Sequence, residues 1–237
     1  MSSPIASAPP PGQDRPADVL LTAFPRGRLS EIVGPWSSGG SSLLLALLSR
    51  VTATGALAAL VDEDDALDPA SAREAGVDLR HLLWVRCGGR PGLALRAADL
   101  LARCPGFLVV AVDLGTRPTP RILHPSLVRL QRAVESGGGA LVLRTSRHVT
   151  GSVAGLVLSV SAAHVSWAGT PTPTCLGGLL SAVEVAVTRG HCQPGAWSPS
   201  LAPSPGVPDR GQRFHFFFSP GSSPVGPGTL PNEKGAA

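Results

Sequence analysis

A glycine- and serine-rich turn between two apolar segments constrains this sequence more than any other feature. Residues 29–33, LSEIV, have the apolar content of a short buried strand, and residues 42–52 have that of a helix that ends before Gly55. The turn between them, residues 34–41, reads GPWSSGGS. A strand, a tight glycine-rich turn and a helix in this order begin a βαβ unit. The sequence therefore predicts an α/β fold built outward from this turn.

The turn matches the phosphate-binding loop pattern GxxxxGK[ST] at every defined position but one. Gly34 and Gly39 occupy the two glycine positions and Ser41 the hydroxyl position, but Gly40 stands where the pattern has lysine. In such a loop, backbone N–H groups and the helix N-terminus bind phosphate oxygens, and the lysine contacts the outer phosphates. A charge-assisted hydrogen bond contributes about 1.5–3 kcal/mol. The missing lysine therefore predicts weak or absent nucleotide binding.

We accordingly expect a degenerate nucleotide site with negligible hydrolysis, no metal site, and no cofactor beyond weak binding of ATP and magnesium. Asp113 joins this site because it ends a continuous apolar run, residues 107–112, as the magnesium-binding aspartate of such proteins does. Asp113 has a second interpretation as a plain polar strand end. The candidate nucleotide-binding residues are Gly34, Pro35, Ser37, Ser38, Gly39, Gly40, Ser41, Ser42 and Asp113.

Strand and helix patterns alternate up to about Thr188, which predicts an α/β fold with a largely parallel sheet flanked by helices. The expected strands are residues 29–33, 56–61, 82–86, 107–112, 140–144, 153–160, 163–167 and 180–188. The expected helices are residues 42–52, 69–74, 92–103 and 126–135. Two of these strands, 153–160 and 163–167, are close enough in sequence to form a hairpin.

The chain has 28 glycines and 24 prolines, a share that indicates irregular segments. Residues 1–18 are rich in Pro, Ser and Ala, and the composition changes to Pro, Ser and Gly after residue 190. We expect a disordered lead-in at residues 1–18, a core at 19–190 and a disordered Pro/Ser/Gly-rich tail at 191–237. The sequence RFHFFF at residues 213–218 interrupts that tail. It is either a strand that returns to the sheet edge, which we favour, or a docking peptide.

Four cysteines without a CxxC pair predict reduced and mostly buried thiols. The N-terminus lacks the basic and apolar regions of a secretory signal, and the longest apolar stretch, residues 43–61, is interrupted by Arg50 and Gly55. These features predict a cytoplasmic protein that does not contact a membrane. The net charge of +4 permits nucleic-acid or acidic partners without requiring either.

Two blocks of this sequence resemble the RecA recombinase family. The first is the GPxSSG loop, and the second is a strand leading into the turn ALDP, residues 66–69, followed by AR-x-x-GVD-x-x-x-L, residues 72–82. The resemblance implies a RecA-like P-loop NTPase core. It also places Asp64 at the position of the family's catalytic glutamate. Because Asp is one methylene shorter than Glu, we interpret residues 62–65 as solvated turn carboxylates, with Asp64 a vestigial catalytic candidate.

The same resemblance implies two DNA-binding loops, at residues 114–125 and 146–152. Arginines cluster in this part of the chain and are opposed only by Asp113 and Glu135. A basic zone of this kind is suited to phosphate contacts that are non-specific and salt-sensitive. An arginine-biased solvated surface is an equally good interpretation. The candidate DNA contacts are Arg117, Arg121, Arg144 and Arg147, with Arg129 and Arg132 nearby.

A short RecA-like core with abbreviated DNA loops and no loop lysine is most similar to the ImuA-type accessory proteins of bacterial mutagenic translesion synthesis. That similarity implies a non-catalytic adaptor in the DNA damage (SOS) response. Its expected partner is an ImuB-like pseudo-polymerase or another translesion polymerase component, with self-association and DNA contact as further options. Two alternatives stay open: a slow DNA-dependent ATPase that takes its cation from a neighbouring subunit, and a SulA-like cell-division inhibitor.

Overall fold

The computed structural model describes residues 24–115, 122, 124–168, 178–190 and 213–218. Within these ranges the strands form a single 8-stranded sheet of order β3-β2-β4-β5-β1-β6-β7-β8. The strands are β1 (Leu29–Val33), β2 (Leu57–Asp62), β3 (Leu82–Arg86), β4 (Phe107–Asp113), β5 (Ala140–Thr145), β6 (Leu156–Ala168), β7 (Gly178–Arg189) and β8 (Arg213–Phe218). The helices are α2 (Gly40–Ala53), α3 (Pro69–Glu74), α4 (Pro91–Arg103) and α5 (His124–Gly137), with a 3-10 turn η1 (Leu79–His81).

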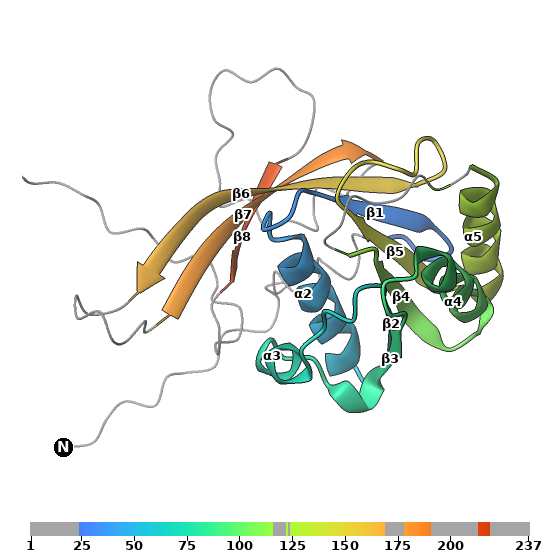
Figure 1. The fold of residues 1–237 in the computed structure, drawn as a ribbon, viewed down its shortest axis with the longest axis horizontal. Helices are drawn as coiled ribbons and strands as arrows, with labels where there is room; N and C mark the ends of the chain where they lie inside the picture. The colour runs from blue at the N-terminus through green and yellow to red at the C-terminus, as the bar shows by residue number, and fades with distance from the viewer. Residues whose placement is uncertain (1–23, 116–121, 123, 169–177, 191–212, 219–237) are drawn as a thin grey trace, which may run out of the picture.

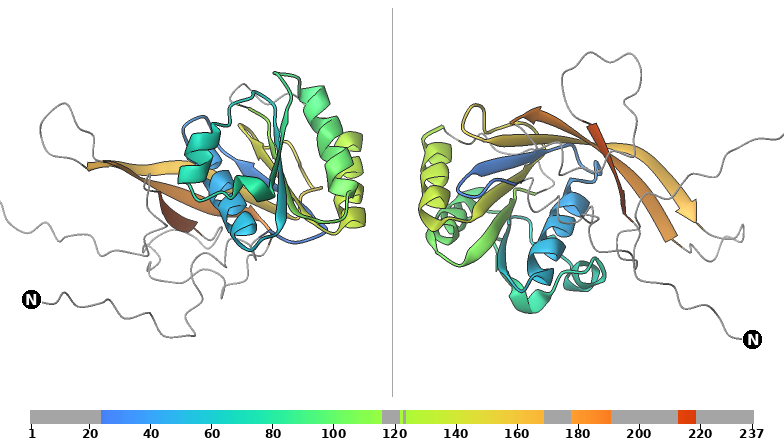
Figure 2. Two further views of the ribbon diagram at one scale, coloured as in Figure 1. Left: turned by 90° about the horizontal axis from the view of Figure 1, so that it is seen from below. Right: turned by 180° about the vertical axis from the view of Figure 1, so that it is seen from behind.

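The first six strands in the sheet order, from β3 at the edge to β6, are parallel to one another. The sheet continues with β7, which is antiparallel to β6, and β8, which is antiparallel to β7. Helices α2 and α3 cover one face of the parallel part, and α4 and α5 cover the other (Figure 1). The antiparallel strands extend past the helices as a long twisted ribbon (Figure 2). Parallel strands covered on both faces read as continuous apolar runs, as Phe107–Asp113 does. The α/β fold class and the largely parallel sheet are confirmed.

The core is divided into two layers by the sheet. On the α2 side, Leu43, Leu47 and Val51 pack against Ile32 and Val142, all fully buried. On the other side, small residues of α4 and the leucines of α5 pack against the opposite faces of the same strands. Ala94, Ala98 and Ala102 let α4 lie close to the sheet. The two layers hold the carboxyl ends of β2, β4 and β5 beside the beginning of α2.

Most element boundaries agree with the sequence-based expectations, and two differ for a physical reason. Helix α2 begins at Gly40 rather than Ser42, because Gly39 adopts φ 91° and can serve as its N-cap. The region expected to hold two strands is one continuous strand, β6. Its pairing with β7 shifts register between Ala162 and His164, so the interruption in the pattern marks a bulge and not a turn.

The segment RFHFFF is strand β8, and it pairs antiparallel with β7 from Arg213 opposite Ala186 to Phe218 opposite Ser181. The other expectations for the termini concern residues 1–23, 191–212 and 219–237, which lie outside the described residues. In the part of the chain that is described, no helix has the length and apolarity to cross a bilayer.

Candidate nucleotide site and basic surfaces

The loop between β1 and α2 is a tight turn that leads from a buried strand into the N-terminus of a helix. The Gly34 N–H donates to the Thr145 carbonyl at 3.0 Å, which ties the start of the loop to β5. A Cβ added at Gly34 would lie 2.6 Å from the Val160 carbonyl oxygen, so only glycine fits there. Ser37 and Gly39 have φ of 61° and 91°, and these left-handed residues curl the loop back onto the helix. The side chain of Trp36 is exposed at its tip.

The beginning of α2 offers backbone donors to an anion. No side chain caps this helix and no acidic residue lies in its first turn. The Ser38 hydroxyl is buried and has no hydrogen-bond partner within the described part of the chain. A phosphate-sized anion would accept hydrogen bonds from this buried hydroxyl and from the uncapped N–H groups beside it. The backbone of this loop therefore fits an anion.

A cationic side chain of β5 lies beside position 40. A Cβ built on Gly40 would meet Arg144 first, with Arg144 Nε at 3.5 Å and Cγ at 3.8 Å. Arg144 is the fifth residue of β5, and its side chain is only 6% exposed. The loop pattern has lysine at position 40, and the space beside that position holds the Arg144 side chain. The sequence of the loop alone does not indicate that an arginine near the end of β5 lies beside position 40.

Arg144 forms a buried ion pair with Asp113. Arg144 Nη1 donates to Asp113 Oδ1 at 2.8 Å and to the Gly115 carbonyl at 2.8 Å, and the Gly115 N–H donates back to Asp113 Oδ1 at 3.0 Å. Burial raises the pKa of Asp113 above its ordinary value, and the Arg144 guanidinium opposes this rise. The carboxylate expected to contact magnesium is thus engaged by a guanidinium.

The acidic turn after β2 lies at the same point of the sheet. Asp64 contacts the Gly115 Cα region so closely that a Cβ there would collide with its carboxylate. Asp64 thus lies beside Gly115, which hydrogen-bonds to Asp113. Arg144 connects Asp113 to the start of α2. These residues lie close together because the carboxyl ends of the parallel strands β2, β4 and β5 share one edge of the sheet.

The expectation that residues 62–65 are solvated is wrong for Asp62 and Glu63, which are both buried. Asp62 accepts hydrogen bonds from the N–H groups of Ala66 and Leu67 and from Trp84 Nε1. Asp65, half-buried, pairs with Arg86 at 3.2 Å. The carboxylates are folded into the turn because β2 is an interior strand, flanked by β3 and β4.

These groups can be compared with what a magnesium nucleotide requires. Such a ligand takes a cradle of N–H groups, a lysine, a hydroxyl and an accessible carboxylate. The chain supplies the cradle and the exposed Ser41 hydroxyl, but position 40 carries no cation and Asp113 is bound by Arg144. The donor set does not fit a magnesium nucleotide, although its backbone fits an anion.

A buried glutamate fixes the loop that follows β5. Glu31, on β1, is completely buried and accepts from the Thr145 hydroxyl at 2.8 Å, the Val149 N–H at 2.9 Å and His148 Nδ1 at 2.7 Å. The Thr150 hydroxyl and N–H also donate to it. The segment 146–152, expected to be a DNA-binding loop, is therefore attached to the centre of the sheet at residues 148–150.

The arginines that the sequence grouped together lie in different surroundings. Arg144 is buried against Asp113 and presents no surface to DNA, whereas Arg147 is exposed beside His148. Arg117 and Arg121 lie outside the described residues. Arg129 and Arg132 are exposed on α5, on the far side of the sheet from α2. The single basic zone of the sequence is thus separated into distinct sites. Of the cysteines, Cys87 is buried and Cys104 is exposed, while Cys175 and Cys192 are not described.

The strand order, the two helical layers and the loop before α2 define the molecule as an α/β protein with a P-loop topology. Comparison with solved structures makes this more specific. The crystal structure of the RadB recombinase matches with a TM-score of 0.54 and 14% sequence identity, over 81% of this chain and 88% of that chain. At this level of identity the similarity concerns the fold, which is RecA-like.

Sequence comparisons agree with the fold. Residues 17–123 match the RecA N-terminal domain family. Protein RecA of Methylococcus capsulatus is 43% identical over 98 residues, which are 41% of this chain and 28% of that protein. Protein RecA of Borrelia duttonii is 39% identical over 101 residues, 43% of this chain and 28% of the relative. Each alignment thus spans little more than a quarter of the length of these relatives.

Proposed function

We propose that this chain is a nucleotide-independent, RecA-like accessory protein of the DNA damage response, and that it acts as an adaptor in error-prone translesion synthesis as ImuA-type proteins do. One observation carries the non-catalytic part of this proposal. Arg144 binds Asp113 beside Gly40, so the chain neutralises internally the carboxylate that a RecA-like NTPase would use for magnesium. The match to the RecA N-terminal domain supports the setting in DNA repair or recombination.

The adaptor role follows from what such a site leaves the protein able to do. Without a nucleotide cycle, a RecA-like domain has no chemical source for switching between two states, and its remaining function lies in surfaces. The proposed partner is an ImuB-like pseudo-polymerase or another translesion polymerase component, with non-specific DNA contact through exposed arginines as a secondary interaction.

The second candidate function is a slow ATPase, and Arg144 itself favours it. A guanidinium next to position 40 could replace the missing lysine from within the same chain, without a neighbouring subunit. The two candidates differ in what Arg144 does: in the adaptor it occupies the site, and in the ATPase it binds phosphate.

Calorimetric titration of ATP with magnesium distinguishes these functions. If the protein is a nucleotide-independent adaptor, ATP should not bind measurably to the wild-type protein or to Gly40→Lys. ATP should bind only to the double variant Gly40→Lys/Arg144→Asn, because that variant has the loop lysine and frees Asp113 from its ion pair. Micromolar affinity of the wild-type protein that is lost in Arg144→Ala would establish the ATPase instead. A pull-down with a purified ImuB-like protein, and with a tubulin-like division protein as comparison, tests the partner.

A further inference from the structure

Helix α4 exposes a stripe in which leucine and arginine alternate. Leu93, Arg96, Leu100 and Arg103 follow one another at helical spacings of three and four residues, and all four are exposed. Leu100 is 66% exposed, an unusual degree for a leucine in a helix whose other face packs against a sheet. Helix residues three and four apart lie on the same side, so the stripe is continuous.

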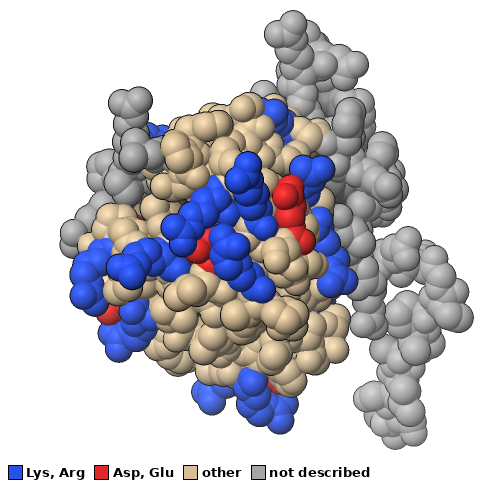
Figure 3. Space-filling model, turned by 90° about the vertical axis from the view of Figure 1, so that its right-hand side faces the viewer, with Lys and Arg blue, Asp and Glu red and all other residues tan. Residues whose placement is uncertain are grey.

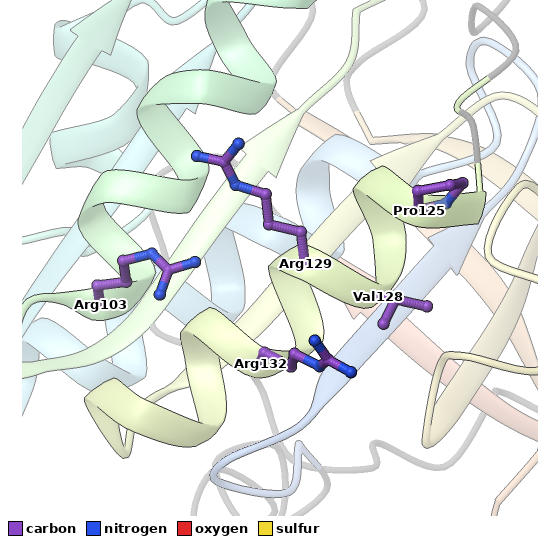
Figure 4. Close-up of a pocket in the computed structure, with 5 residues that line it drawn as sticks. All are labelled: Arg103, Pro125, Val128, Arg129 and Arg132. Atoms are coloured by element: carbon purple, nitrogen blue, oxygen red, sulfur yellow. The ribbon is translucent and has the colours of Figure 1, made fainter.

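Helix α5 extends this stripe with two more arginines. Arg103, Arg129 and Arg132 surround a hollow of about 670 Å³ together with Pro125 and Val128 (Figure 4). Arg103 and Arg129 reach toward each other across the groove between α4 and α5 (Figure 4). We call this feature the α4–α5 surface, formed by Leu93, Arg96, Leu100, Arg103, Arg129 and Arg132.

A buried carboxylate holds two of these guanidinium groups, those of Arg103 and Arg129, in place. Asp99, a buried residue of α4, accepts from Arg129 Nη2 at 2.7 Å and from Arg103 Nη2 at 3.0 Å. The two arginine side chains nevertheless stay 68% and 44% exposed, with further N–H groups to donate. Groups fixed before binding lose less conformational entropy on binding. Asp99 therefore pre-organises this part of the surface.

Negative charge is scarce on the same face. Basic side chains outnumber acidic ones across it (Figure 3). Asp99 is buried under the arginines, and the exposed Glu135 lies next to Arg28, 3.9 Å away. Neither Arg96 nor Arg132 has an ion-pair partner among the residues that the structure describes. The surface thus combines unbalanced positive charge with exposed leucine.

We propose that the α4–α5 surface docks an acidic, leucine-containing segment of a protein partner. Charge complementarity selects the acidic side chains of that segment, and Leu100 and Leu93 provide the apolar contact. Arginine is enriched in protein interfaces and among their energetically dominant residues. A nucleic-acid backbone would use the arginines but would leave the leucines exposed, and for this reason a protein segment fits better. This proposal does not depend on the partner's identity or on the state of the nucleotide site.

A peptide selection tests the proposal without a known partner. A displayed library of random 16-residue peptides is selected on the full-length protein and counter-selected on Leu100→Ser/Arg132→Glu, two exposed changes that should leave the fold intact. We expect enriched peptides with Asp or Glu and with apolar residues at helical spacing. By fluorescence anisotropy, a synthetic peptide of the enriched sequence should bind about tenfold more weakly to Leu100→Ser and to Arg132→Glu than to the wild-type protein.

Arg73→Glu is the matched control for Arg132→Glu. Arg73 is exposed on α3, on the opposite side of the sheet, and the two substitutions change the net charge by the same amount. Arg73→Glu should leave peptide affinity within about twofold. Failure to enrich any peptide that distinguishes the wild type from the counter-selection variant would overturn the proposal. It would equally be overturned if labelled single-stranded DNA bound more tightly than the peptide, with loss in Arg132→Glu and none in Leu100→Ser.

Discussion

At the residue scale, the charges of the candidate site are arranged by side chains far apart in sequence. Arg144 and Asp113 come from different strands, and neither belongs to the glycine-rich loop. The sequence indicated the loop by its motif, Asp113 by the apolar run that it ends, and Asp64 by the resemblance to the RecA family. It could not place Arg144 beside Asp113 and Gly40, since the strand order decides that β5 lies next to β4. The chemistry of this site is therefore a property of the sheet as much as of the loop.

The ion pair yields a pH-dependent prediction. Burial holds the pKa of Asp113 above its unfolded value, so native-state stability is highest below that unfolded pKa and falls as the pH rises through the folded pKa. Arg144→Met removes the opposing charge and should raise this pKa further. We expect a loss of about 3 kcal/mol in the free energy of unfolding at neutral pH, shrinking toward pH 4, in urea titrations.

The double variant Asp113→Asn/Arg144→Met supplies the control for this experiment. It has no buried carboxylate to ionise, so it should recover much of the lost stability and show no added pH dependence. If Arg144→Met were equally destabilised at pH 4 and pH 7, the ion pair would not be the cause.

Glu31 gives a second prediction at the same scale. Its removal in Glu31→Ala leaves the Val149 and Thr150 N–H groups and two hydroxyls without their acceptor, at a cost of about 3 kcal/mol in the free energy of unfolding. Amide hydrogen exchange in residues 146–152 should accelerate. The neighbouring change Ser30→Ala is the comparison: the Ser30 hydroxyl is buried without a partner in the described part of the chain, so its removal should cost nothing. Equal losses in both variants would refute a specific role for Glu31.

At the element scale, the sequence predicted the existence and type of nearly every helix and strand of the parallel core. Continuous apolar runs such as 107–112 indicate strands buried on both faces, and Pro69 after Asp68 marks the start of α3, where the Asp68 carboxylate accepts from the Ser71 N–H at 2.9 Å. Tertiary pairing decided the rest. The bulge in β6 interrupts the alternation that identifies a strand, and the sequence pattern alone does not separate a bulge from a turn.

The link between α4 and α5 gives a prediction at this scale. Burial opposes ionisation of Asp99, but hydrogen bonds from Arg129 and Arg103 outweigh it, so the pKa of Asp99 lies below its ordinary value. Its stabilising contribution is present above the unfolded pKa and is lost as the pH falls through the folded pKa. Because both arginines are substantially exposed, we expect Asp99→Asn to lower the free energy of unfolding by only about 1 kcal/mol at pH 7.

The difference between wild-type and Asp99→Asn should disappear in strongly acidic buffer, where Asp99 is protonated in both the folded and unfolded states. Chemical denaturation at a series of pH values measures it. Asp68→Asn is a control on the α3 side, because the hydrogen bonds that Asp68 accepts in the described part of the chain come from Ala70 and Ser71 of α3 and involve neither α4 nor α5. A difference for Asp99→Asn that stays constant in acid would mean that the carboxylate charge contributes nothing.

At the scale of the whole molecule, the sheet has two parts with different neighbours. The parallel strands are covered by helices on both faces, while the strands from β6 to β8 extend beyond them (Figure 2). The sequence predicted the parallel part well, because helix and strand patterns alternate regularly along that part of the chain. It left two interpretations for residues 213–218, since a short aromatic segment after a long Pro/Ser/Gly-rich stretch suits either a strand or a peptide ligand. Pairing of β8 with β7 depends on contacts that are distant in sequence.

Deletion of Phe214–Phe218 tests what β8 contributes to the fold. The ladder pairs six residues of β7, 181–186, with the six of β8, and its loss would turn β7 into an open edge strand. A net loss of about 2 kcal/mol should lower the melting temperature by about 4–8 °C for a chain of this size, and amide exchange in β7 should accelerate. Truncation after Phe218 retains β8 and is the matched control, with an unchanged melting temperature expected. If the deletion instead left melting and exchange unchanged but abolished partner binding, β8 would be a docking segment and not a structural strand.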